Sequence, residues 1–129
     1  MDKALGYIGL ARRGGNIEIG EQRAKALVKS GRARLMIVAS DTSPGARRRA
    51  EGYVYGYDTP LIIVPYTKET ISQAVGVPGC SMAAFGDTGL ALSFVRALET
   101  DSGEYDAAAE TLSQRLERSR KSGNRRKSE

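Results

Sequence analysis

Two short, unbroken apolar runs place the strongest constraint on how this chain can fold. They occupy residues 35–39 and 61–64, and each has the length of a strand. A strand with one solvated face alternates apolar and polar residues, so an unbroken run indicates a strand covered on both faces. Between the two runs lies a helix-start signal, Ser40 to Pro44, followed by a helical pattern. We therefore expect a sheet with helices on both sides.

The same alternation extends over most of the chain. Helical periodicity and capping residues predict helices over residues 4–13, 21–30, 44–57, 68–75 and 88–98. Short apolar or alternating runs predict strands over residues 16–19, 35–39, 61–64 and 80–85. This order predicts an α/β fold, a three-layer α/β/α sandwich around a small four-stranded sheet. We expect the sheet to be mixed, because the short first strand can pair antiparallel at an edge.

The domain organisation follows from length and from a change in composition near residue 100. A chain of 129 residues is expected to form one domain, which we place at residues 1–100. Residues 101–118 repeat apolar residues at helical spacing and predict a C-terminal helix. Residues 119–129 are basic and polar, and we expect a flexible tail there.

Charge is distributed unevenly along the chain. Residues 1–49 hold 11 Lys and Arg against 4 Asp and Glu, whereas residues 50–110 hold 2 against 9. Residues 111–129 hold 7 cations and 2 carboxylates. Basic segments concentrated in this way predict a polyanionic partner, nucleic acid above all. The alternative is a solvated basic surface that serves only solubility.

Several function classes are disfavoured by residues that the sequence lacks. The chain has no His, which excludes His-based catalysis and His-ligated metal sites. Its single Cys80 has no His partner and is expected to be a buried thiol, and no Gly-rich nucleotide fingerprint follows a strand. We therefore expect no enzyme, no metal and no cofactor. No signal peptide or membrane-length apolar run is visible, so we expect a cytoplasmic monomer without membrane contact.

Several short motifs, in a fixed order, resemble the bacterial YlxQ-type proteins. They are Gly6-Tyr-Ile-Gly-Leu-Ala-Arg-Arg-Gly-Gly15, Ile19-Gly-Glu21, Gly31-Arg-Ala-Arg-Leu35, Val38-Ala-Ser-Asp41, Arg47-Arg-Arg49, Thr59-Pro60 and Phe85-Gly-Asp-Thr-Gly-Leu-Ala91. The resemblance spans residues 4–98 and extends to the ribosomal-protein superfamily of L-seven-Ae, L-thirty-e, S-twelve-e and Gadd-forty-five. It implies the α/β/α sandwich and RNA binding, with a kink-turn as the usual target.

The resemblance also implies where RNA would bind. In that superfamily RNA meets the start of the second helix and the loop before the fourth strand. The corresponding residues here are Gly20, Glu21, Gln22, Arg23, Lys25, Ala26, Val77, Pro78 and Gly79, with Lys68 nearby. Further phosphate contacts are expected from Arg12, Arg13, Arg47 and Arg48. Taken without the resemblance, Gly20 could equally serve as an ordinary turn residue, and Pro78-Gly79 is better explained as a routine turn.

The second-helix motif differs from that of strong kink-turn binders at three positions. Gln22 stands where they have Asn or Lys, Arg23 where they have Glu or Gln, and Ala26 where they have Lys. An arginine donates to phosphates or guanine acceptors but cannot accept a hydrogen bond from a base. The expectation is therefore binding of rRNA or another structured RNA, in association with the ribosome or translation. The alternative is a protein-interaction module that docks a basic partner, such as a ribosomal or other RNA-associated protein, on the acidic second half.

Overall fold

The chain folds as a sequence of alternating helices and strands followed by a long final helix. The computed structural model describes every residue except 1, 100, 101 and 129, and every described side chain except those of residues 121–128. The elements are α1 (Lys3–Arg13), β1 (Ile17–Ile19), α2 (Glu21–Lys29), β2 (Leu35–Val38), α3 (Pro44–Val54), β3 (Leu61–Ile63), α4 (Lys68–Val75), β4 (Met82–Phe85), α5 (Thr88–Leu98) and α6 (Asp106–Ser128).

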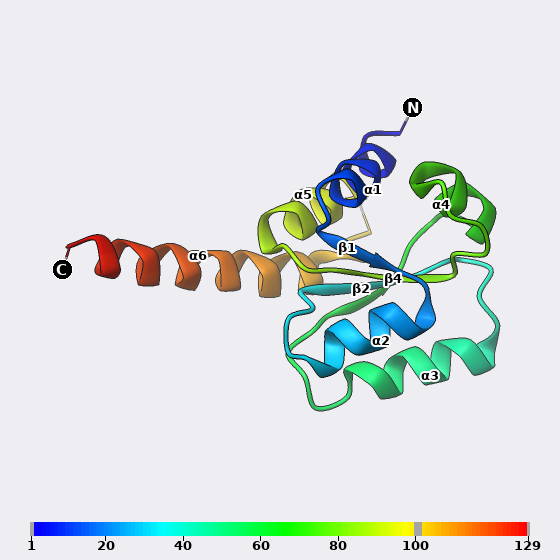
Figure 1. The fold of residues 1–129 in the computed structure, drawn as a ribbon, viewed down its shortest axis with the longest axis horizontal. Coiled ribbons are helices and arrows are strands. Elements are labelled where there is room, and N and C mark those ends of the chain that lie inside the picture. The colour runs from blue at the N-terminus through cyan, green and yellow to red at the C-terminus, as the bar shows by residue number, and fades with distance from the viewer. Residues whose placement is uncertain (1, 100–101, 129) are drawn as a thin grey trace.

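The four strands form one mixed sheet, in the order β1-β4-β2-β3. β2 and β3 are parallel, whereas β4 is antiparallel to both of its neighbours, β1 and β2. β1 lies at one edge, as its shortness predicted. Helices α1, α4 and α5 cover one face of the sheet, and α2 and α3 cover the other (Figure 1). The predicted three-layer α/β/α sandwich is confirmed.

The central strands supply both hydrophobic cores. In β2, Leu35 and Ile37 pack into the core beneath α1 and α5, while Met36 and Val38 pack into the core above α2 and α3. β4 alternates in the same way, and its Phe85 ring lies 5.2 Å from that of Phe94 on α5. Because both faces are covered, the central strands need apolar residues at every position, which is why β2 is an unbroken apolar run.

β3 differs from the expectation that it is buried on both faces. It is the edge strand opposite β1, and its last residue, Ile63, is 40% exposed. An apolar run therefore indicated a strand correctly but overstated its burial, because the pattern cannot distinguish a central strand from an edge strand. The Ile63 carbonyl accepts a hydrogen bond of 3.1 Å from the Tyr105 hydroxyl, so the chain before α6 lies beside this strand.

Helix α3 ends earlier than the expected residue 57. It stops at Val54, after which Tyr55 adopts an extended backbone and Gly56 has a φ of 84°. A left-handed glycine is a common way to leave a helix. The turn that follows positions Asp58 and Thr59 before β3.

The final helix contributes to the core beyond residue 100, where we expected the domain to end. Tyr105, Ala108 and Leu112 are buried against α5 in the same cluster as α1. The helix then runs past residue 118, its expected end, and reaches Ser128. Residues 119–128 contain no proline and five Lys and Arg residues, which favour a helix, although Gly123 and Asn124 are weaker helix formers. The mobility of residues 119–129 in solution stays a prediction.

Candidate functional site

The first turn of α2 is open to solvent ligands because its N-cap is a glycine. Gly20 has a φ of 100° and carries no side chain to cap the helix. Its own N–H donates to the Met82 carbonyl of β4 at 2.9 Å, which holds the turn against the sheet. Helices α1, α3, α4 and α5 are instead capped by Asp2, Ser43, Thr67 and Asp87. The uncapped amides of α2, together with the helix dipole, can bind an anion.

The polar residues of α2 divide into two groups. Glu21 accepts hydrogen bonds from Arg49 at 2.7 and 3.0 Å and from the Tyr53 hydroxyl at 2.5 Å. The Arg49 and Tyr53 hydrogen bonds lower the pKa of Glu21 to about 2. Lys25 lies over the Tyr53 ring at 5.3 Å. Glu21 and Lys25 are thus turned toward α3, and their charges are partly engaged there.

The other predicted residues of α2 are directed to solvent. Gln22 and Ala26 are exposed, and the Arg23 side chain is 76% exposed. Arg23 lies 3.8 Å from the Glu18 carboxylate of β1. An exposed ion pair at that distance is weak and screened by salt, so Arg23 can exchange Glu18 for a phosphate at little cost in free energy.

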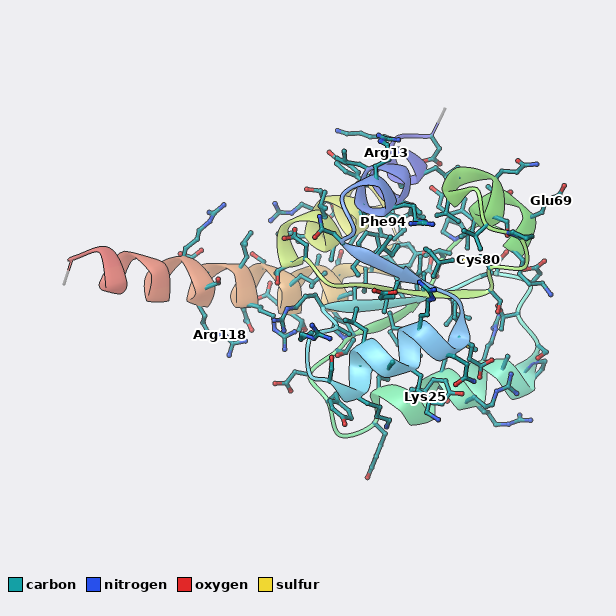
Figure 2. All side chains as sticks on the ribbon, viewed as in Figure 1. Arg13, Lys25, Glu69, Cys80, Phe94 and Arg118 are labelled. Atoms are coloured by element: carbon teal, nitrogen blue, oxygen red, sulfur yellow. The ribbon has the colours of Figure 1, made fainter. Side chains whose placement is uncertain are left out.

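The loop between α4 and β4 is held in a fixed shape. Gly76 and Gly79 both adopt left-handed backbone conformations, with φ values of 72° and 71°. The Ser72 hydroxyl of α4 accepts a hydrogen bond from the Cys80 N–H at 3.0 Å, tying the end of the loop to the helix. Cys80 itself is buried, as predicted, and burial raises the pKa of its thiol. In Figure 2 it lies near the junction of α4 with the sheet.

A surface hollow of about 290 Å³ brings the start of α2 together with this loop. We call it the β1 hollow, because it follows the edge strand. Its lining residues are Arg12, Gly15, Ile17, Glu18, Ile19, Arg23 and Val77. Two cations, an apolar floor and one carboxylate thus surround a space that a nucleotide could partly enter. The structure brings together three predicted residues here: Arg12, Arg23 and Val77.

A second hollow, of about 580 Å³, lies on the other side of the loop. We call it the α4 hollow. Its lining residues are Asp41, Lys68, Glu69, Ser72, Pro78, Gly79 and Ser81. It joins the predicted Lys68 to Pro78 and Gly79, but its two carboxylates make it less favourable to phosphate than the β1 hollow. The loop therefore separates the predicted residues into two sets.

The remaining predicted cations lie outside both hollows. Arg13 is exposed on α1 (Figure 2). Arg47, at the start of α3, donates from Nη2 to the Ser40 carbonyl at 2.8 Å, and its buried Nε has no hydrogen-bond partner among the described atoms. Arg48 is exposed. These residues share the basic character of the first half of the chain without forming one compact site.

Two carboxylates of the site were missed by sequence reasoning. Glu18 lies beside Arg23, and its alternation with Ile17 and Ile19 could have indicated that it projects from the strand. Asp41 accepts a hydrogen bond of 2.9 Å from the Lys68 N–H at the start of α4, although it precedes α3 in sequence. The two residues are 27 positions apart in the sequence, so no local pattern predicts their contact.

Two features are absent from the part of the chain that the structure describes. No group of three or more His, Cys, Asp and Glu residues there could hold a metal ion. None of the helices in that part combines the length and the apolar character that crossing a membrane requires.

Comparison with known proteins finds one curated relative in sequence and many solved structures with a similar fold, two of which are described below. No family model matches the chain. The RNA-binding protein YlxQ of Enterococcus faecium is 29% identical over 76 residues, covering 59% of this chain and 73% of that protein. A protein of unknown function from Bacillus halodurans C has a TM-score of 0.71 at 21% identity, covering 78% of this chain and 100% of that one. A 15.5 kD RNA-binding protein from Giardia lamblia has a TM-score of 0.58 at 19% identity, covering 85% and 82% respectively.

Proposed function

Because the chain resembles the YlxQ-type RNA-binding proteins in sequence and shares the sandwich fold of its structural neighbours, we propose that it is an RNA-binding protein of this type. The observation that carries the proposal is the β1 hollow, where Arg12 and Arg23 lie beside the uncapped start of α2. Cations and free helix amides are the groups that bind RNA phosphates.

The parts of this surface are suited to different features of RNA. The α2 amides and Arg23 would hold a phosphate, and the absence of a Cβ at Gly20 lets a backbone approach closely. Gln22, exposed beside them, can donate to and accept from a base edge or a 2′-hydroxyl. Val77 and Pro78 would support an unstacked base with apolar surface. Glu21 and Lys25 would act mainly by fixing α2 against α3.

We propose a structured RNA as the target, with rRNA as the leading candidate and association with the ribosome or translation as the setting. A bent or kinked element presents the close phosphates and unstacked bases that this surface can contact. Arg23 in place of a hydrogen-bond acceptor favours phosphate or guanine acceptors over the base contacts of strong kink-turn binders. We also propose that the protein acts by binding rather than catalysis, as the names of its relatives suggest. The cytoplasm is the location that we propose for it.

A pair of charge reversals on α2 tests the site. Arg23→Glu reverses the charge of a largely exposed cation of the β1 hollow, whereas Lys25→Glu makes the same charge change on a residue turned toward Tyr53. Binding to a labelled structured rRNA fragment should weaken at least tenfold for Arg23→Glu and much less for Lys25→Glu, with a lower salt dependence for the former. Equal losses in the two variants would indicate a general charge effect and reject this site.

The RNA structure can be tested with the unaltered protein. Crosslinking in cells and sequencing first identify the bound RNA. A kink-turn RNA and a plain duplex of the same length are then compared as competitors against that RNA for binding to the purified protein. Preference for the kink-turn would support the usual superfamily mode. If the kink-turn competes no better than the duplex while the cellular RNA binds tightly, another structured target is indicated.

Docking of a basic protein on the acidic second half is not favoured. The carboxylates of residues 50–110 lie on several elements: Glu51 on α3, Glu69 on α4, Asp87 before α5 and Glu110 on α6. Lys68 and Arg96 lie among them. Glu99, Asp106 and Glu110 share one hollow, which Arg96 also lines, but Glu51, Glu69 and Asp87 lie on other elements. The negative charge that is contiguous in sequence is therefore only partly gathered on the surface.

A further inference from the structure

A second group of cations lies at the end of the sheet opposite the start of α2. Strands β1, β2 and β3 run in the same direction, because β1 and β2 are both antiparallel to β4 and β3 is parallel to β2. Gly20 follows β1 at the carboxyl ends of these strands, whereas Arg34 precedes β2 and Asp58 precedes β3. Arg34 and Asp58 therefore lie at the amino ends, the end from which α6 projects (Figure 1).

Helix α6 adds two more arginines at that end. Arg115 and Arg118 are three residues apart and so share a helix face. They line an open hollow of about 430 Å³ together with Thr111, Gln114 and the segment from Asp58 to Pro60. Arg115 donates to the Asp58 carbonyl at 3.4 Å, and its guanidinium lies 3.9 Å from the Asp58 carboxylate. Figure 2 shows Arg118 extending from α6 on the side of α2 and α3.

The positive charge at this place is only partly neutralised. Burial lowers the pKa of Arg115, and the nearby positive charges of Arg34 and Arg118 lower it further. Asp58 opposes them, but its side chain is 91% exposed and its carboxylate contact with Arg115 is long. Like charges held together repel each other, and an anion bound between them would remove that repulsion.

We propose that Arg34, Arg115 and Arg118 form a second RNA phosphate-binding surface, so that one protein molecule holds two RNA segments at opposite ends of its sheet. This inference rests on the proposed RNA-binding function. Phosphate backbone fits the surface better than a protein or a lipid membrane. Protein interfaces centre on apolar and aromatic anchors, and a membrane-surface helix needs an apolar face. Beyond Leu116 the sequence of α6 contains no apolar residue, while Arg118, Arg120, Lys121, Arg125, Arg126 and Lys127 follow.

A bridging experiment with the full chain tests the proposal. One RNA hairpin is fixed to beads, and a second, fluorescent hairpin of the same sequence is captured only if a bound protein holds both. Unaltered protein should capture the fluorescent hairpin. Arg34→Glu with Arg118→Glu should still bind the fixed hairpin but lose most of the capture, with a salt slope lower by about two for the second hairpin. Lys3→Glu with Arg96→Glu, an equal charge change at two exposed residues elsewhere, is the matched control.

A variant that should increase capture excludes misfolding as the explanation for a loss. Asp58→Asn removes the opposing carboxylate and should increase capture severalfold, an effect that a damaged fold would not give. Full capture by Arg34→Glu with Arg118→Glu, or no gain in Asp58→Asn, would overturn the second surface.

The Arg23→Glu variant separates this proposal from the first. If the α2 site is wrong and the second surface is right, Arg23→Glu leaves hairpin binding intact and the Arg34 and Arg118 reversals abolish it. If the α2 site is right and the second surface is wrong, only Arg23→Glu reduces binding. An unaltered protein that binds neither hairpin would overturn both proposals.

Discussion

At Glu21, the first residue of α2, a carboxylate expected to meet RNA is already engaged inside the molecule. Arg49 and Tyr53 both donate to it, and its side chain is 24% exposed. A negative charge at a helix N-terminus is also favoured by the helix dipole. The residue thus joins the start of α2 to α3 and keeps a carboxylate from repelling phosphate at the β1 hollow. Sequence reasoning named the position but could not foresee partners that lie 28 and 32 residues away.

The Glu21 contacts predict a stability change that depends on pH. Glu21→Gln should lower the free energy of unfolding by about 1–2 kcal/mol near neutral pH, since it weakens charge-assisted hydrogen bonds on a partly exposed surface. The folded-state pKa of Glu21 is about 2, below the ordinary value of 4.5. The carboxylate's contribution to the free energy of unfolding is therefore complete above pH 4.5 and is lost as the pH falls toward 2. Urea unfolding of both proteins across this range should show the difference shrinking with acid. A constant difference would instead assign the effect to packing.

Among the elements, local signals located the helices better than the sheet edges or the core. The start of α4 was predicted from Thr67 and that of α5 from Asp87, because a capping hydrogen bond involves residues three apart. The edge position of β3 and the long-range contact from Asp41 to α4 depend on tertiary packing, which no short pattern encodes. For the same reason the sequence identified Arg12, Arg23 and Val77 separately, but only the fold brings them to one hollow.

Two leucines of α6 test how far along this helix the cooperatively folded domain extends. Leu112 is 0% exposed within the core, whereas Leu116, one helical turn later, is only partly buried against it. Leu112→Ala should lower the free energy of unfolding by about 2–4 kcal/mol, through lost burial and the cavity left behind. Leu116→Ala should lower it by about 1 kcal/mol, in proportion to the smaller buried area. Urea denaturation of both variants measures the difference. Equal, small effects would place α6 outside the cooperative unit.

On the scale of the whole molecule, the net charge of +5 conceals an arrangement suited to a polyanion. The sandwich places Arg12 and Arg23 beside the uncapped start of α2, and α6 extends away from the other end of the sheet (Figure 1). The carboxylates of the second half are divided among several elements instead of facing one partner. The basic end of the chain therefore follows the part of α6 that packs in the core, which ends near Leu112. The charge of this end can be changed with little effect on the free energy of unfolding.

Removal of residues 121–129 makes this separation testable. The segment carries four cations and one carboxylate, so its loss lowers the net charge from +5 to +2. Because the core residues of α6 precede it, the free energy of unfolding should change by less than about 0.5 kcal/mol. Affinity for a long structured RNA should fall, and the slope of log affinity against log salt should decrease by up to about four, one for each phosphate that the truncated protein no longer neutralises.

Replacing the four cations by Gln in the full-length chain is the matched control, since it removes the charge and keeps the length. An unchanged salt slope in both proteins would show that the basic end binds no phosphates, and a large loss of stability on truncation would show that charge and folding are not separated along α6.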